Sequence, residues 1–111
     1  MAEQHPKQEI VNGILEEVAR EVDRAECLHP EWPTDLLRQV MVVSEEMGEV
    51  QKAALTLVER LEDGQCGEMD SFWKERIVRL NLDIDEEAVQ VAAMVLRFLY
   101  NRRINQMEGK L

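Results

Sequence analysis

The sequence has few of the features that mark several common classes of protein. Its two cysteines, Cys27 and Cys66, have no CxxC spacing, which argues against a disulfide framework or a structural zinc site and favours a reducing compartment. Uncharged runs such as residues 89–96 are too short to span a bilayer, and the first residues lack a basic region followed by an apolar stretch. These absences predict a soluble, cytoplasmic protein without a membrane partner.

Basic residues are also scarce. The chain has 13 Lys and Arg and 23 Asp and Glu, which gives a net charge of −10. That charge repels the phosphates of nucleic acids and anionic membrane surfaces, so cations are the expected partners and nucleic acid is not. No GxSxG, P-loop or Rossmann glycine pattern occurs, and His5 and His29 have no partner at catalytic spacing. Catalysis through a side-chain nucleophile is therefore not expected.

Glycine and proline are rare as well, with 5 Gly and 3 Pro in 111 residues that are 45% hydrophobic. This composition predicts one folded, all-α domain, a bundle of three to four helices. Residues 1–7 read as a frayed leader, and helices are expected over 8–28, 35–62 and 71–105. A chain this short buries little area alone, so a homo-dimer or homo-tetramer is expected.

Prolines, glycines and capping residues set the bounds of these predicted helices. Two prolines, Pro30 and Pro33, cannot lie inside a helix and mark a loop, after which Thr34 or Asp35 offers an N-cap. Glycines 64 and 67 end the second helix, and Asp70 or Ser71 caps the next. Residues 81–85 are poor in good helix formers, so a break there, giving two helices in place of one, is an alternative.

Apolar residues at helical spacing predict an inner face for each helix. In the first helix they are Val11, Ile14, Val18, Val22 and Ala25. In the second they step by four and three: Leu36, Val40, Val43, Met47, Val50, Ala54, Leu57 and Leu61. In the last segment they are Phe72, Ile77, Leu80, Ile84, Val91, Val95 and Phe98. The face of the second helix is expected to be core.

Carboxylates interrupt the inner face of the second helix. At about 100° per residue, Glu46 and Glu49 lie along its border, whereas Glu45 points nearly away. Unpaired carboxylates aimed toward an interior are costly, so they are expected to be protonated, paired with cations or bound to a metal.

The last helix carries a similar acidic stripe. Glu87 lies within its inner face, and Asp83 and Gln90 border that face on one side. Two helices that present such oxygens to a shared interior can hold a hard cation, Mg²⁺ or Mn²⁺. The alternative is that both groups belong to a solvated surface, since Glu pairs at this spacing are common on exposed helices.

Residues 32–33, 43–55 and 86–94 resemble the MazG-like branch of the all-α nucleotide pyrophosphohydrolases, and the resemblance covers residues 32–100. It implies an ExxE and a later ExxD that bind Mg²⁺ for cleavage of a nucleoside triphosphate to the monophosphate and pyrophosphate, a house-cleaning activity. Glu46 and Glu49 match the first pair, and Glu87 matches the first acid of the second. Gln90 stands where the family has Asp, and Asp83 or Glu45 are the candidates to supply the missing charge.

Three further residues are candidates for substrate binding. Trp32 precedes the second helix and either stacks on a nucleobase or plugs the bundle. Arg97, on the same border as Gln90, and Lys52 are candidates to neutralise phosphates.

Two other functions remain open on the sequence. A catalytically degenerate family member would keep the bundle as a binding or assembly module, and Gln90 favours this alternative. A coiled-coil adaptor is permitted by the 4-3 spacing of the second helix, although inward carboxylates have no use in it.

Overall fold

The computed structural model describes residues 6–64 and 71–110, and all regular structure in these ranges is helical, which confirms the all-α class. The helices are α1 (Lys7–Leu28), α2 (Leu36–Gly64) and α3 (Ser71–Met107). Of the expected leader, residues 1–5 lie outside the described residues and Lys7 is already helical. One helix runs through residues 81–85, so the alternative with a break there is wrong.

The start of α2 is fixed by its capping residue. The backbone N–H of Leu37 donates to Asp35 Oδ1 at 3.1 Å, and the N–H of Gln39 donates to the Asp35 carbonyl at 3.0 Å. Asp35 is therefore the N-cap, one of the two residues that the sequence offered. The buried Gln39 side chain also donates to the Pro33 carbonyl at 2.8 Å, which ties the preceding loop to the first turn. Asp70, a cap candidate for α3, lies outside the described residues.

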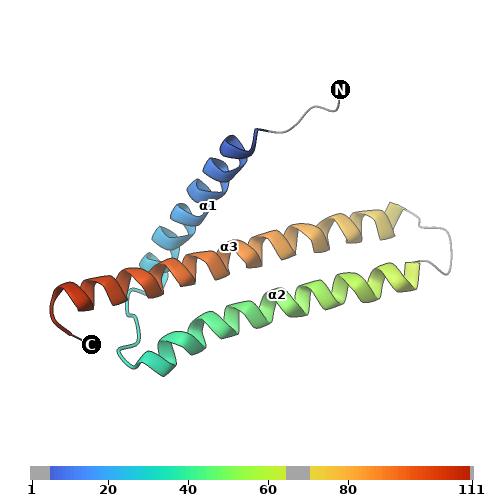
Figure 1. Ribbon diagram of the computed structural model, residues 1–111. Coiled ribbons are helices and arrows are strands. Elements are labelled where there is room, and N and C mark those ends of the chain that lie inside the picture. The colour runs from blue at the N-terminus through green and yellow to red at the C-terminus, as the bar shows by residue number, and fades with distance from the viewer. Residues whose placement is uncertain (1–5, 65–70, 111) are drawn as a thin grey trace.

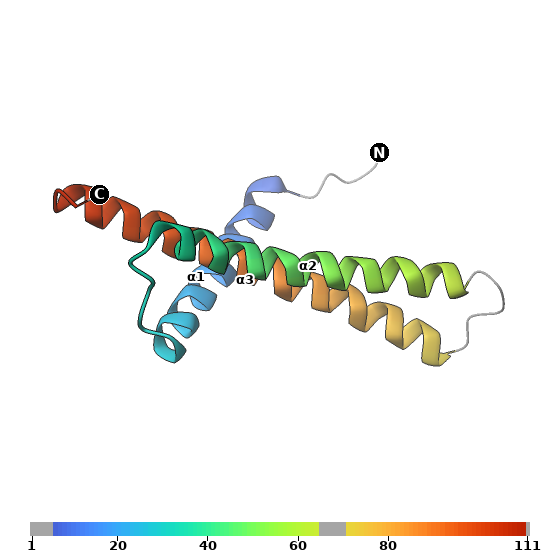
Figure 2. The same ribbon diagram turned by 90° about the horizontal axis from the view of Figure 1, so that it is seen from below.

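The three helices form an open arrangement. Helices α2 and α3 lie side by side and antiparallel as a long hairpin, and α1 crosses α3 near its middle at a steep angle (Figures 1 and 2). The molecule measures 61 × 37 × 22 Å, with a radius of gyration of 18.3 Å. A compact chain of this length has a radius of gyration of about 13 Å. The hairpin therefore extends well beyond the part that α1 covers.

The core lies where α1 crosses α3. Its buried members are Val18 and Ala25 of α1 and Ala93 and Met94 of α3. The partly buried side chains packed around them are Val22, Trp32, Val42, Val43, Val89 and Ala92. These residues come from all three helices and the first loop, so the crossing is where the whole chain is held together.

Several positions expected in the core are exposed instead. The predicted inner face of α2 is too wide for α3 alone to cover, so only its α3 side is shielded. The exposed members are Leu36, Val40, Met47 and Leu61 of α2, Ile14 of α1, and Phe72 and Val95 of α3. None of the helices in the described ranges combines the length and apolar character needed to cross a membrane.

Candidate metal centre

Glu46 of α2 and Glu87 of α3 approach each other across the hairpin, with Gln90 of α3 between them. When its amide nitrogen faces the carboxylates, Gln90 donates to Glu46 Oε2 at 3.2 Å and to Glu87 Oε2 at 3.3 Å. The opposite orientation would place three oxygens within the same distances. One amide therefore links the acids of the two helices, and we call these three residues the acidic cluster.

The two carboxylates of the acidic cluster are destabilised in their charged forms. The pKa of Glu46 is raised by burial and then by the charges of Glu87 and Glu49. The pKa of Glu87 is raised by burial and then by the charges of Glu49 and Asp83. Both shifts have the same physical causes, which are burial and the negative charges of neighbouring carboxylates.

The other sequence-predicted ligands lie at the margin. Glu49 is exposed, contrary to the expectation that it points inward, yet its charge reaches both members of the acidic pair. Glu45 is exposed, as its position on the helix predicts. Asp83 is half-buried and pairs with Arg79 one turn earlier, with Arg79 Nε 3.2 Å from Asp83 Oδ1. Asp83 thus has a cation of its own, which weakens it as a substitute for the charge absent at Gln90.

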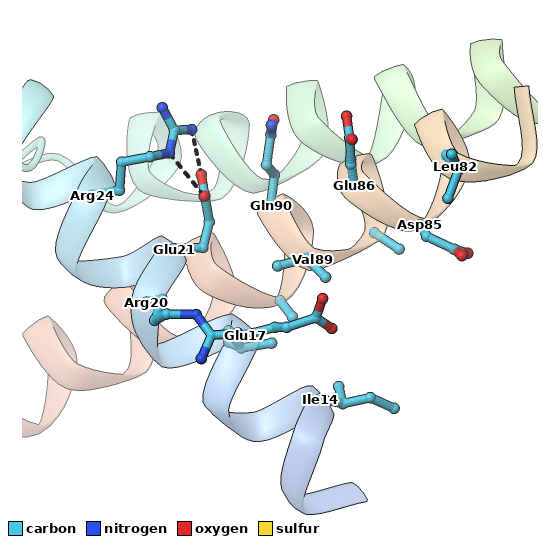
Figure 3. Close-up of a pocket in the computed structure, with 13 residues that line it drawn as sticks. Ile14, Glu17, Arg20, Glu21, Arg24, Leu82, Asp85, Glu86, Val89 and Gln90 are labelled. Atoms are coloured by element: carbon cyan, nitrogen blue, oxygen red, sulfur yellow. Dashed lines mark hydrogen bonds and ion pairs between the residues drawn. The ribbon is translucent and has the colours of Figure 1, made fainter. Parts of the chain in front are cut away.

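Helix α1 adds a carboxylate that sequence reasoning missed. Glu21 is half-buried, and its charge contributes to the raised pKa of Glu46. Arg24 grips Glu21 with two hydrogen bonds, one of them from Nε to Oε2 at 2.9 Å, beside Gln90 (Figure 3). Glu21 could have been noticed in the sequence as an acid at the border of the face that carries Val18 and Val22. Only the crossing of α1 over α3, however, brings Glu21 toward Glu46.

A cavity of about 450 Å³ leads from the acidic cluster to the first loop. Glu46 and Gln90 line one end, and Trp32 and Arg97 line the other. Glu21 and Arg24 also line its wall, and they take part as well in a larger groove of about 880 Å³ between α1 and α3 (Figure 3).

Arg97 is only 5% exposed, and it clasps the first loop to α3. Its Nη2 donates to the His29 carbonyl at 2.8 Å, and its guanidinium lies 4.9 Å from the centre of the Trp32 ring. Trp32 itself packs against the core, as the plugging alternative expected. Its buried Nε1 has no hydrogen-bond partner within the described part of the chain.

Two observations limit the site. Lys52 is exposed and lines neither cavity, so the structure does not bring it to the acidic cluster. Within residues 6–64 and 71–110, no three side chains of His, Cys, Asp or Glu are grouped so as to hold a metal ion. The cluster supplies two carboxylates and an amide, oxygen donors that suit a hard cation such as Mg²⁺.

Comparison of the chain with family models, with curated proteins and with solved structures yields no match in any of the three. What the fold and the site define is a class: a small all-α protein in which an acidic cluster lies between two antiparallel helices, beside a crossing third helix.

Proposed function

We propose that the chain is a Mg²⁺-dependent nucleoside triphosphate pyrophosphohydrolase that acts on the nucleotide pool, with Mn²⁺ as an alternative ion. The observation that carries the proposal is the meeting of Glu46 and Glu87 over Gln90, where burial and the charges of neighbouring acids raise the pKa of both carboxyls. A divalent cation would offset that repulsion. The resemblance to the MazG-like family supports the same reading.

Glu46, Glu87 and the Gln90 amide oxygen would hold the ion, with Glu49 at the exposed rim. Ligation by Gln90 would use its amide oxygen, whereas its hydrogen bonds to Glu46 and Glu87 use its amide nitrogen, so the amide would have to turn. When bound, the ion supplies charge neutralisation for the triphosphate and lowers the pKa of an attacking water.

The remaining work falls to the chain's own residues. Water would form a bond to the α-phosphorus while the bond to the bridging oxygen of the β-phosphate breaks, which releases pyrophosphate. The exposed Glu49, whose charge raises the pKa of both Glu46 and Glu87, would accept the proton of that water. The cavity between the cluster and Trp32 has room for a nucleoside, since ligand pockets begin at about 300 Å³.

The Gln90 amide also favours a second candidate function, a binding or assembly module without turnover. Because Gln90 can donate to both carboxylates, the cluster has an internal partner without metal, and a degenerate family member could keep it as part of a binding or assembly module. The proposal also includes homo-oligomeric assembly, which concerns a different surface of α2.

The experiment is pyrophosphate release from a panel of ribo- and deoxyribonucleoside triphosphates, with Mg²⁺, with Mn²⁺ and with chelator. Glu46→Gln and Glu87→Gln should each lower the rate about 100-fold or more, the loss typical of removing one group that stabilises transition-state charge. Glu59→Gln, an exposed acid of the same helix outside the cluster, should keep the wild-type rate.

Gln90→Asp separates the two candidates. In a weakened active site it adds the missing charge and should tighten Mg²⁺ and raise the rate, whereas Asp83→Asn should do little because Asp83 is already paired with Arg79. Absence of pyrophosphate release from wild type and Gln90→Asp with every nucleotide would refute the enzyme and leave the binding module.

A further inference from the structure

Neither of the cations that the sequence offered for the substrate's phosphates is available at the acidic cluster. Lys52 is exposed and lines neither cavity. Arg97 is buried, and its guanidinium is engaged by the His29 carbonyl and the Trp32 ring. A nucleoside triphosphate carries more negative charge than one divalent ion offsets, and the chain has a net charge of −10 of its own. The proposed activity therefore needs a further cation beside the acidic cluster.

Arg24 of α1 lies where such a cation is needed. Among the described residues, those that line both the cavity of about 450 Å³ and the groove of about 880 Å³ are Glu21, Arg24 and Gln90. In Figure 3 these side chains point to the same side of the groove, whereas Arg20, one turn earlier on α1, points another way. Arg24 thus lies where the cavity lined by Glu46 meets the open groove.

The guanidinium of Arg24 is held in place and still has donors to offer. Its Nε donates to Glu21 Oε2 at 2.9 Å, and its Nη2 donates to Glu21 Oε1. The N–H groups of Nη1 are not used by these two bonds, so they can donate to an acceptor in the cavity. The Arg24 side chain is 55% exposed, whereas that of Glu21 is 16% exposed. A ligand that enters from solvent would therefore meet the cation of this pair first.

A phosphate is the acceptor that this arrangement suits. The planar guanidinium can bind two phosphate oxygens at once, and charge-assisted hydrogen bonds of this kind are about twice as strong as neutral ones. In the proposed site the metal ion is held by Glu46 and Glu87, and the nucleoside extends toward Trp32. The terminal phosphates would then extend the other way, toward the place that the cavity shares with the groove.

From these observations we propose that Arg24 binds the terminal phosphates of the substrate, and that Glu21 holds its guanidinium toward the cavity before the substrate arrives. This inference rests on the proposed function, which supplies the triphosphate. Arg24 is a substrate-binding residue in this scheme and takes no part in proton transfer. Its loss should therefore weaken the binding of the triphosphate more than it slows the chemical step.

The first test measures binding, so it does not depend on turnover. The probe is inorganic tripolyphosphate with Mg²⁺, titrated into the full chain by calorimetry. Arg24→Met should weaken this binding about tenfold or more, the loss expected when hydrogen bonds to a charged group are removed. Arg20→Met removes an arginine that lines the groove but not the cavity, and it should keep the wild-type affinity. Melting temperatures close to that of wild type should show that both variants fold, since both arginines are exposed.

Glu21→Gln distinguishes phosphate binding from an ion pair that is only structural. If Arg24 merely neutralises Glu21, both Glu21→Gln and Arg24→Met disturb the same contact and should change the affinity for tripolyphosphate alike. If Arg24 binds phosphate, Glu21→Gln removes a competing negative charge and should keep or tighten the affinity. Arg24→Lys keeps the charge without the planar guanidinium, so its affinity should fall between those of wild type and Arg24→Met.

Kinetics separates this inference from the proposed function. With pyrophosphate release as the readout, Arg24→Met should raise the KM for a nucleoside triphosphate about tenfold or more, with a smaller change in kcat. Arg24-dependent binding of tripolyphosphate without turnover of any nucleotide would refute the enzyme and keep Arg24 as a phosphate-binding residue. Turnover by Arg24→Met with unchanged KM, a wild type that does not bind tripolyphosphate, or losses in Arg20→Met or Glu21→Gln equal to that in Arg24→Met would each overturn the inference.

Discussion

Helix α2 has two sides that behave differently. On the side toward α3 and α1, Val42, Val43 and Glu46 lie in or beside the crossing, where the chain is held together by its own core. On the other side, Leu37, Val40, Met47 and Val58 are apolar, yet they have relative exposures of 44–65%. The side that carries Glu46 is thus partly buried within one chain, whereas the side that carries Leu37 and Met47 is exposed.

This contrast indicates a division of labour along a single helix. Carboxylates are tolerated at the crossing because they remain partly solvated and have an amide between them, at the cost of raised pKa values. Exposed apolar side chains such as Leu37 and Met47 gain stability only from contact with another apolar surface. One side carries Glu46 of the acidic cluster, and the other exposes apolar residues.

The largest effect is expected on the free energy of unfolding, and it is seen by comparing the substitution of one methionine from each region, Met94 and Met47. Met94→Ala removes a buried side chain from the crossing and should lower the free energy of unfolding by about 2–5 kcal/mol at every protein concentration. Met47→Ala removes a half-exposed one from the exposed apolar side of α2, where the proposed assembly would bury it, so its cost should depend on protein concentration. Urea unfolding at several concentrations measures both, and a concentration-independent loss for Met47→Ala would erase the distinction.

A bound metal ion should stabilise the folded chain through the acidic cluster. A cation that binds only the folded acidic cluster, at a hundredfold excess over its dissociation constant, adds about 2.7 kcal/mol to the free energy of unfolding. Mg²⁺ should therefore raise the melting temperature of metal-stripped wild type and have little effect on Glu46→Gln. Scanning calorimetry of the two proteins measures this, and a wild-type transition indifferent to Mg²⁺ and Mn²⁺ would count against the centre.

Arg97 provides a test of how the first loop is held at the crossing. Arg97→Met keeps most of the side-chain volume but removes the hydrogen bond to the His29 carbonyl and the contact with Trp32, and should cost about 1–3 kcal/mol. Urea unfolding followed by tryptophan fluorescence measures this loss of stability. Arg103→Met, at an exposed position of the same helix, is the control and should stay close to wild type.

The smallest effect is the dependence of stability on pH. A carboxyl whose pKa is higher in the folded than in the unfolded state binds more protons when folded, so its contribution is favourable at low pH. Glu46 and Glu87 are such groups, and metal-free stability should fall as pH rises from the ordinary carboxyl range through their raised pKa values. Melting temperatures should fall less steeply in Glu46→Gln, and equal slopes would show that Glu46 is not the source.

Much of the fold was readable because helical signals are local. Apolar spacing, the prolines of the first loop and the cap at Asp35 depend on neighbours in the chain, and they gave helices within a few residues of those observed. The failures involve packing over longer distances. Residues 81–85 are helical despite poor propensity, within one continuous helix that packs against α2 and in which the preceding Leu80 is buried.

The candidate site divides in the same way. Helical periodicity put Glu46 and Gln90 on the borders of inner faces and Glu87 within one, and the structure brings the three together. Glu49 was placed inward by the same rule and is exposed, because a border position turns inward only if a neighbour covers it. Glu21 was missed because the sequence of α1 does not specify which helix packs beside it.

The sequence by itself determined the helices, the Asp35 cap of α2 and the carboxylates that each helix carries, because these depend on spacing and chemistry within a few turns. Only the tertiary structure decided which apolar stripes are covered and which acids become neighbours. It placed α1 across α3, which brings Glu21 toward Glu46 and leaves Leu37 and Met47 of α2 exposed. The physical reason is that burial and electrostatic repulsion are properties of pairs of surfaces, and a single helix does not specify its partner.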